Sequence, residues 1–223
     1  MGIKFSPKTR LIILITLTVL FLVAFGALAD SVVEDQKLIG IDTAIVTAVY
    51  AARTPLLTDL MKSMTTLASV TGVIFASAGV LSWLIITKQR RHLVALLVSL
   101  VGAGVFSELF KLLFARARPA LQSALIAETG YSFPSGHTLV AVCFYGVLAY
   151  FILKAVKSMR ARTATLIVAI IIVFGIGFSR IYLGVHWPTD VLASFLLGAG
   201  WLFLLDSILQ LVGILRKEKL SKH

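Results

Sequence analysis

The sequence predicts an all-α integral membrane protein with six transmembrane helices and one short amphipathic helix in the membrane interface. The 223-residue chain is 59% hydrophobic and only 14% charged, which is more apolar than a soluble domain of this size needs. Its apolar residues gather in long runs, and about 18 or more of them with few charges suffice to cross a bilayer. We therefore expect one membrane-embedded domain over residues 1–223, with its functional motifs at about 108–194.

The first predicted span is the apolar run Leu11–Ala29. The residues Ala27-Leu28-Ala29 before Asp30 resemble a signal-peptide cleavage site, but the run is longer than the usual signal core of about 7–15 residues. We expect an uncleaved helix, and cleavage would leave the remaining topology unchanged.

The next segment, Leu38–Ala52, is amphipathic and too short to span. Asp42 is placed to cap this helix. We expect the helix to lie in the membrane interface and to end at Arg53-Thr54-Pro55, because the residue before a proline disfavours helix.

The remaining apolar runs predict five further spans. Leu56–Thr87 is expected to form one long helix of about 48 Å that crosses the bilayer in its second half. The other four predicted spans are Leu93–Phe114, Leu139–Leu153, Ala164–Phe178 and Val191–Leu215.

The positions of the cations predict the orientation. Short cytoplasmic flanks are enriched in lysine and arginine, so both termini are expected in the cytoplasm. The basic excess, a net charge of +11, is then a topology signal with a contact to anionic lipid, and nucleic acid is not an expected partner. The cations expected on the cytoplasmic side are Lys4, Lys8, Arg10, Lys88, Arg90, Arg91, Lys154, Lys157, Arg160, Arg162, Arg216, Lys217, Lys219 and Lys222.

On the opposite face, Phe178–Asp190 forms a polar island between two apolar runs. Pro188 suits the first turn of the following helix, which places His186 just outside it and Asp190 within reach of the imidazole. A carboxylate there fixes the tautomer of a working histidine, and Arg180 supplies a planar cation for a phosphate. The alternative is a structural ion pair or a snorkelling rim at the membrane surface.

A second cluster, Lys111–Pro119, ends the Leu93–Phe114 run on the same face. Pro119 disfavours helix at Arg118, so Arg118 begins a loop while Lys111 projects from the last helical turns. For Lys111 an intrahelical pair with Glu108 is the alternative. For Arg116 the default expectation is snorkelling at the helix end.

The third cluster, Tyr131–His137, opens the Leu139–Leu153 span. Pro134 near the first turn, followed by Ser135 and Gly136, leaves backbone N–H groups accessible to an anion. His137 stands beside this site, although a lone histidine near a helix start is more often a capping or interface residue.

The three clusters converge on one chemistry. His137 and His186 are the two histidines expected on the outer face, and each lies among groups that bind anions. Together the clusters predict a phosphate site with a nucleophile and an acid. A metal site of His137, His186 and Asp190 is the competing interpretation. Nearby fixed cations would repel a divalent ion, so neither a metal nor another cofactor is expected.

The three motifs read K-x6-R-P, P-S-G-H and S-R-x5-H-x3-D, in that order. This pattern resembles the type-2 phosphatidic acid phosphatase superfamily, in its bacterial phosphatidylglycerophosphatase B and undecaprenyl diphosphate phosphatase branch. The resemblance implies that His186 takes the phosphoryl group, that Asp190 holds and activates it, and that His137 protonates the leaving oxygen. It implies that the phosphate oxygens are held by Lys111, Arg118, Arg180, Ser135 and Gly136.

The implied partner is a lipid phosphate drawn from the bilayer, and the motifs do not select the lipid. Phosphatidylglycerophosphate, phosphatidic acid and undecaprenyl diphosphate remain open. Arg116, spare in a monophosphate site, is placed to receive a second phosphate, which favours a dual enzyme. A transporter would need ionisable groups near mid-membrane on several helices, and here only Asp206 and Glu108 qualify. A non-catalytic scaffold is the remaining alternative, and the oligomeric state is open.

Overall fold

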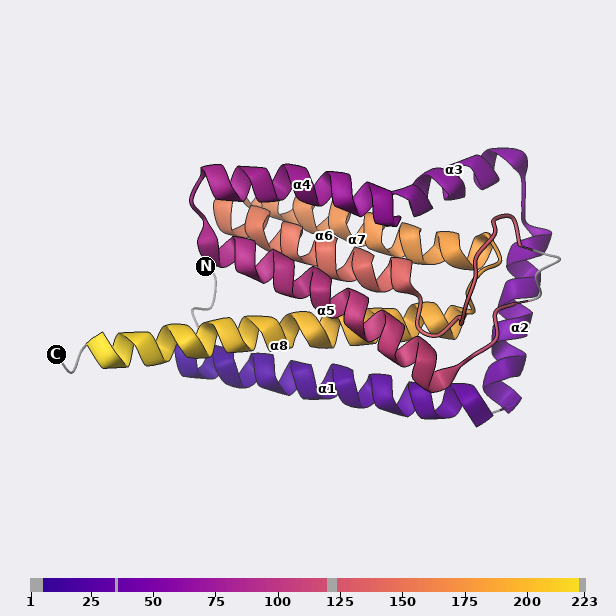
Figure 1. Cartoon of the computed structure of the whole chain (residues 1–223), viewed down its shortest axis with the longest axis horizontal. Helices are drawn as coiled ribbons and strands as arrows, with labels where there is room; N and C mark the ends of the chain where they lie inside the picture. Colours follow the sequence, from indigo (N-terminus) through magenta and orange to yellow (C-terminus); the bar gives the residue numbers. More distant parts are fainter. Residues whose placement is uncertain (1–5, 35, 120–123, 221–223) are drawn as a thin grey trace.

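The computed structural model describes residues 6–34, 36–119 and 124–220. These residues form eight α-helices and contain no strand. Figure 1 shows long helices running side by side, with α2 standing across one end of the bundle. The helices are α1 (Pro7–Glu34), α2 (Gln36–Ala51), α3 (Pro55–Thr66), α4 (Val70–Ile86), α5 (Arg90–Phe114), α6 (Gly136–Ala155), α7 (Met159–Tyr182) and α8 (Pro188–Leu220).

Five of these helices are long and apolar enough to cross a membrane, namely α1, α5, α6, α7 and α8. The pair α3 and α4 passes the same test only as one broken span, which gives up to six. The predicted all-α membrane fold is therefore confirmed. At 16 residues, α2 is too short to count among the spans, as expected of the segment Leu38–Ala52.

The prediction of one long helix over Leu56–Thr87 is wrong, because the helix breaks between Thr66 and Val70 and the chain bends there by 50°. The side chain of Ser69 accepts a hydrogen bond from the Gly72 N–H at 3.0 Å and so starts a new helix. Serine is strongly preferred at this capping position. A Cβ added at Gly72 would lie 2.2 Å from the Thr66 carbonyl oxygen, so the bend also needs a glycine there.

The expected role of Asp42 as the cap of its own helix is also wrong. Helix α2 already begins at Gln36, and Asp42 lies inside it. The predicted end of this segment is confirmed, because α2 ends at Ala51 and Thr54 caps α3 by accepting from the Leu57 N–H at 3.3 Å.

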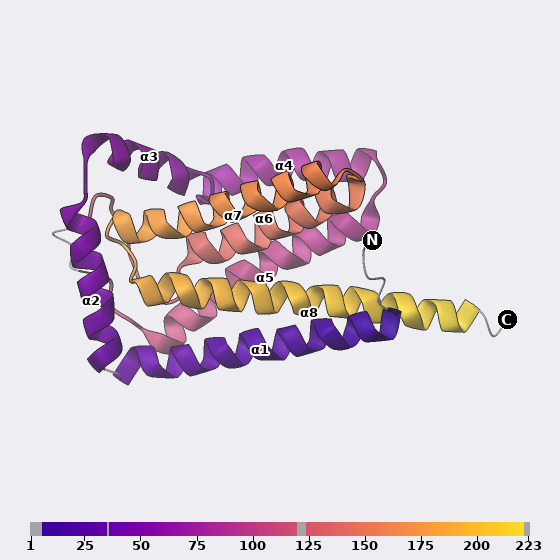
Figure 2. The same cartoon turned by 180° about the vertical axis from the view of Figure 1, so that it is seen from behind.

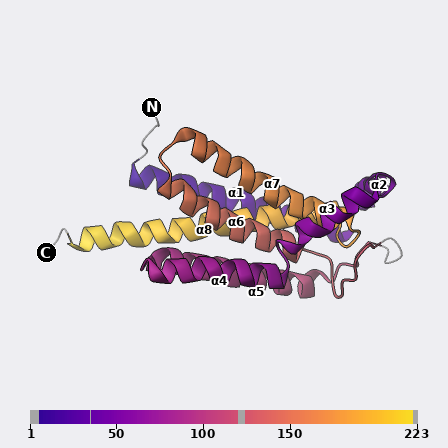
Figure 3. The ribbon, with the colours of Figure 1, turned by 90° about the horizontal axis from the view of Figure 1, so that it is seen from above.

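Small residues let the helices that carry the polar motifs approach one another closely. A Cβ added at Gly198 of α8 would lie 2.7 Å from Val142 of α6, and one at Gly102 of α5 would lie 2.5 Å from the Trp201 ring. Seen from above, α4 and α5 lie on one side of α6 and α8, and α7 lies on the other (Figure 3). Helices α5 to α8 thus form a tight frame at whose α2 end the polar motifs meet.

The turns that carry the cations lie together at the other end of the bundle. There α1 begins, α8 ends, and the α4–α5 and α6–α7 connections turn (Figures 1 and 2). This grouping matches the one that the cation count predicted. Lys4 and Lys222 lie outside the described residues, as do the side chains of residues 216–220.

Candidate active site

The three predicted clusters meet at the α2 end of the bundle. The C-terminus of α5, the connection to α6, the N-terminus of α6 and the turn between α7 and α8 all lie there (Figure 1). The connection packs on that turn through its backbone, since the Leu125 N–H donates to the Leu183 carbonyl at 2.9 Å. The three motifs therefore lie close together in space.

His186 lies in the turn between α7 and α8, and its side chain is only 2% exposed. Its Nδ1 is 2.8 Å from the Ser132 carbonyl oxygen, and its Nε2 is 3.3 Å from Nη1 of Arg118. Because a carbonyl only accepts, Nδ1 carries the proton and Nε2 keeps its lone pair. The Ser132 carbonyl therefore fixes the tautomer, a role that the sequence had suggested for Asp190.

The surroundings also keep His186 neutral. Burial lowers its pKa below the ordinary histidine value, and the charges of Arg180 and Arg118 act in the same direction, while Asp190 opposes them. A neutral ring whose Nε2 keeps its lone pair is the form in which histidine acts as a nucleophile or a base.

Asp190 lies in the first turn of α8, as predicted, and is fully buried. Its Oδ2 accepts from the Trp187 N–H at 2.8 Å and lies 3.5 Å from Nδ1 of His186. Its Oδ1 accepts from Arg116. The carboxylate thus fixes the start of α8 immediately beside the imidazole.

Arg116 does not snorkel as expected, because its side chain is 11% exposed and lies among carboxylates. Its Nη2 donates to Asp42 at 2.7 Å, and its Nη1 donates to Thr189 at 2.8 Å and to Asp190. Both terminal nitrogens are engaged in this cluster. A second phosphate would therefore have to compete with these carboxylates for Arg116, and its predicted role there stays a prediction.

Arg118 holds the connection between α5 and α6 against the site. It donates from Nε to the Gly130 carbonyl at 3.0 Å, from Nη1 to Val185 at 2.7 Å, and from Nη2 to Thr129 at 3.0 Å. Its side chain is 8% exposed. The same guanidinium that faces Nε2 of His186 is thus oriented by backbone carbonyls.

Arg180, near the end of α7, is almost wholly buried. It donates to the Thr65 hydroxyl of α3 at 2.7 Å and pairs with Glu128. Among the residues that the structure describes, its Nε has no hydrogen-bond partner. A buried guanidinium therefore retains one free donor at the site.

Glu128 lies outside all three predicted clusters. Its carboxylate pairs with Arg180 and lies 3.9 Å from Nη2 of Arg118, between two cations predicted to hold phosphate. Burial alone would raise the pKa of Glu128, but the charge and hydrogen bond of Arg180 together with the charges of His137 and Arg118 outweigh burial and hold that pKa below its ordinary value. The sequence feature that could have indicated Glu128 is that it is the one acidic residue in the stretch 115–135.

The N-terminus of α6 completes the site. Ser135 precedes its first residue, Gly136, and the first N–H groups of a helix have no intrahelical acceptor. A Cβ added at Gly136 would lie 3.7 Å from Nζ of Lys111, so the ammonium stands close to these donors. Lys111 also makes the intrahelical pair with Glu108, at 2.8 Å, that the sequence offered as the alternative to a phosphate role.

His137, in the first turn of α6, is half-buried. The charged and titratable groups that act on its imidazole come from the other two clusters and from Glu128. They are Arg180, Glu128, His186 and Lys111. The structure therefore brings both histidines and three of the predicted cations into one site, and the fourth, Arg116, binds Asp190 at its base.

The described residues contain no group of three or more histidine, cysteine, aspartate or glutamate side chains placed to hold a metal ion. The competing set of His137, His186 and Asp190 is thus not arranged around a common centre.

Residues 92–212 match the family model described as the PAP2 superfamily, and they include all three motifs. The chain belongs to the PAP2 superfamily. It is 32% identical to phosphatidylglycerophosphatase B of Bacillus subtilis over 196 residues, 85% of this chain and 91% of that protein. It is 34% identical to the undecaprenyl-diphosphatase of Sulfolobus acidocaldarius over 139 residues, 60% of this chain and 63% of the relative.

Two solved structures share the fold of this PAP2 protein. A transmembrane PAP2-type phosphatidylglycerolphosphate phosphatase from Bacillus subtilis superposes with a TM-score of 0.79 and 29% identity, covering 86% of this chain and 94% of that one. Aquifex aeolicus LpxE gives a TM-score of 0.58 and 27% identity, covering 73% and 93%. The protein is therefore a multi-pass member of the membrane lipid phosphatases of this superfamily.

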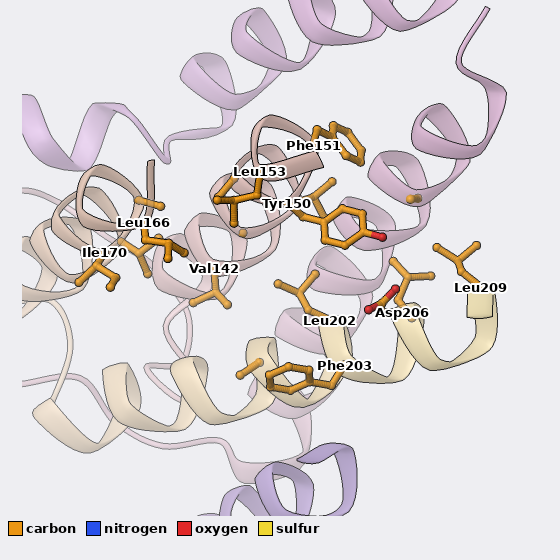
Figure 4. Close-up of a pocket in the computed structure, with 18 of the residues that line it drawn as sticks. Val142, Tyr150, Phe151, Leu153, Leu166, Ile170, Leu202, Phe203, Asp206 and Leu209 are labelled. Carbon is orange, nitrogen blue, oxygen red and sulfur yellow. The ribbon is translucent and has the colours of Figure 1, made fainter. Parts of the chain in front are cut away.

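A cavity of about 470 Å³ in the PAP2 protein lies away from the motifs, between α6, α7 and α8 (Figure 4). Its lining is almost wholly apolar, from residues such as Val142, Ile170 and Phe203. The one charged residue in that lining, Asp206, pairs with Arg10 at 2.8 Å. This cavity has no group that suits phosphate, so the polar site at the α2 end is the candidate active site.

Proposed function

We propose that this PAP2 protein removes the terminal phosphate of a lipid phosphate or diphosphate through a phosphohistidine at His186. The observation that carries the proposal is the geometry around His186. Its Nδ1 lies 2.8 Å from the Ser132 carbonyl oxygen, and its Nε2, which keeps the lone pair, lies 3.3 Å from Nη1 of Arg118. A nucleophile beside a fixed cation is the arrangement that in-line phosphoryl transfer needs.

In the first step, Nε2 of His186 bonds to phosphorus while the bond from phosphorus to the lipid oxygen breaks. His137 gives its proton to that leaving oxygen, as a general acid does. In the second step, His137 takes a proton from water, the water oxygen bonds to phosphorus, and the P–N bond breaks. Inorganic phosphate leaves, and both histidines return to their starting forms.

The phosphate oxygens would be held by Lys111, Arg118, Arg180 and the N–H groups around Ser135 and Gly136. The ion pair between Glu128 and Arg180 supports this assignment, because a carboxylate and a phosphate offer the same kind of oxygen acceptor. Fixed donors that match the developing charge supply most of the rate enhancement in such reactions. A metal ion is then unnecessary, and we propose that the reaction is metal-independent.

Two relatives suggest the lipid. The relative that aligns with 85% of this chain is named phosphatidylglycerophosphatase B, which favours phosphatidylglycerophosphate as substrate. The undecaprenyl-diphosphatase relative favours undecaprenyl diphosphate as a second substrate. Since Arg116 is held by Asp42 and Asp190, the second phosphate of that lipid would have to compete with these carboxylates for it.

We further propose that the site faces the outside of the cell membrane and that both termini are cytoplasmic. The cationic turns at Lys88–Arg91 and Lys154–Arg162 lie at the bundle end opposite the site (Figures 1 and 2). Lysine and arginine in short flanks are typical of the cytoplasmic side. The lipid would then enter sideways from the outer leaflet.

The test is phosphate release from phosphatidylglycerophosphate by the purified protein in detergent with excess chelator. We expect full activity with chelator and none for His186→Ala. A phosphoryl group from labelled substrate should be trapped on the wild type by acid-free, alkaline quenching and should be absent from His186→Ala. Activity that vanishes with chelator and returns with a divalent ion would support the metal alternative. A protein without any phosphatase activity would support a transporter or a scaffold.

A further inference from the structure

Asp42 lies on α2, outside the residues 92–212 that match the PAP2 model, and yet it reaches the base of the candidate site. It is fully buried. Its Oδ1 accepts from the Thr189 backbone N–H at 3.0 Å. Its Oδ2 accepts from Nη2 of Arg116 at 2.7 Å and from the Thr189 hydroxyl at 2.5 Å. A carboxylate from the interfacial helix therefore caps the first turn of α8.

The energetics make this more than an incidental contact. Burying a carboxylate costs several kcal/mol unless other donors replace the lost water. Asp42 has a guanidinium, a hydroxyl and a backbone N–H as donors, and the last belongs to a helix N-terminus, which favours negative charge. The pairing therefore fixes the position of both partners, α2 and the start of α8.

Arg116 connects Asp42 to the reactive histidine. One terminal nitrogen of its guanidinium binds Asp42, and the other binds Asp190. Asp190 in turn lies 3.5 Å from Nδ1 of His186 and holds the Trp187 N–H beside it. A displacement of Arg116 would therefore move the Asp190 carboxylate, which lies directly beside the imidazole of His186.

We propose that Asp42 is a positioning residue of the phosphoryl transfer, acting through Arg116 and Thr189 to hold Asp190 and His186 in place. This inference rests on the proposed role of His186 and extends the site beyond the motifs. It makes α2 a support of the active site in addition to a helix at the membrane surface.

Replacing Asp42 by asparagine keeps the size but turns one acceptor oxygen into an NH2 donor, which cannot accept from Arg116 or Thr189. Arg116 then keeps Asp190 as its one carboxylate among these contacts and is free to shift toward it. We expect kcat to fall about 10- to 100-fold, by analogy with the loss typical when groups that orient a metal-ligating side chain are removed. KM should stay within about twofold of wild type. The reason is that, within the described part of the chain, Asp42 contacts none of the predicted phosphate donors directly and reaches the site only through Arg116 and Thr189.

The experiment measures kcat and KM on phosphatidylglycerophosphate in detergent, together with the inhibition constant of inorganic phosphate and the yield of folded protein. The matched control is Asp59→Asn, which removes an exposed carboxylate from the neighbouring α3 and should leave kcat unchanged. Thr189→Val keeps the shape and the backbone N–H but loses the hydroxyl, so kcat should fall by a smaller factor. The Asp42→Asn/Thr189→Val double variant should be no slower than Asp42→Asn, because both act through one network.

Wild-type kcat in Asp42→Asn, or a loss that only follows the yield of folded protein, would overturn the inference. If Asp42→Asn does not fold, wild-type kcat in Thr189→Val would overturn it instead. The His186→Ala variant separates the proposed function from the role of Asp42. Residual turnover in His186→Ala would contradict the proposed function. If His186→Ala is inactive and Asp42→Asn has the wild-type kcat, only the proposed role of Asp42 is contradicted.

Discussion

The carboxylate of Glu128 is paired with the guanidinium of Arg180, which is 1% exposed and lies on a different element of the site. The same carboxylate lies 3.9 Å from Arg118. An oxyanion of the protein thus occupies the space between two cations that the motifs assign to phosphate. An incoming phosphate must compete with this internal anion for Arg180.

Replacing Glu128 by glutamine removes the competing charge with little change in shape. We expect inorganic phosphate to bind more tightly, with an inhibition constant about 2- to 5-fold lower, because a partly exposed ion pair contributes up to ~1 kcal/mol. The measurement is competitive inhibition of lipid hydrolysis at neutral pH, where the lowered pKa of Glu128 keeps the wild-type carboxylate ionised. Weaker phosphate binding in the variant would mean that Glu128 helps to hold the substrate.

The depressed pKa of His186 predicts a specific pH dependence. Burial and the nearby arginines lower this pKa, so the folded protein keeps a neutral imidazole below the pH at which an ordinary histidine is protonated. Activity should therefore persist below about pH 6.5. The unfolded chain takes up the proton first as pH falls, so His186 contributes stability above about pH 6.5 that is lost as pH falls toward its folded pKa.

Arg118→Gln tests this origin of the shift, because it removes one of the cations that lower the pKa of His186. The acid limb of the kcat/KM profile should move to higher pH relative to wild type. Both proteins are assayed on one substrate, so the ionisation of the substrate phosphate cancels in the comparison. An acid limb at the same pH in both proteins would show that another group sets it.

His137→Ala should depend on the leaving group, unlike His186→Ala. Loss of a general acid typically lowers the rate by 10²- to 10⁴-fold for a poor leaving group such as a lipid alkoxide. For an aryl phosphate, whose phenolate leaves without a proton, the loss should be far smaller. The check is the ratio of the two activities in wild type and variant. An equal loss on both substrates would argue that His137 binds phosphate instead of donating the proton.

The motif residues were predictable because local rules place them. Pro188 begins α8, and this fixes where His186 and Asp190 lie relative to each other. Gly136 begins α6, which makes Ser135 and His137 its N-terminal residues. A spacing of a few residues is enough for such inferences.

The contacts between distant residues were not predictable in this way. Arg116 and Asp42 are 74 positions apart, and Arg180 and Glu128 are 52 apart, so no periodicity links them. The cation of Arg116 looked spare because its two carboxylate partners come from other helices. The bend at Ser69 was missed for a different reason, since serine in an apolar run suits helix packing and helix capping equally.

The bend between α3 and α4 should depend on Gly72. A Cβ there would lie 2.2 Å from the Thr66 carbonyl oxygen, so Gly72→Ala forces the turn apart. We expect a loss of about 1–3 kcal/mol, the usual cost of overpacking, seen as a lower melting temperature in detergent. Gly79→Ala on the same helix is the control, because a Cβ there meets nothing within 4 Å. Equal melting temperatures for the two variants would contradict the steric account.

Single cysteines will decide the orientation. In a Cys143→Ala background, which removes the buried native thiol, Ala127→Cys places an exposed thiol in the connection beside the site. Met159→Cys places another at the start of α7, where the native side chain is 73% exposed, at the opposite end of the bundle. If the cationic turns are cytoplasmic, a membrane-impermeant maleimide added to intact cells should label Ala127→Cys, whereas Met159→Cys should react only after the membrane is opened. The reverse pattern would place the active site in the cytoplasm, and the lipid would then have to enter from the inner leaflet.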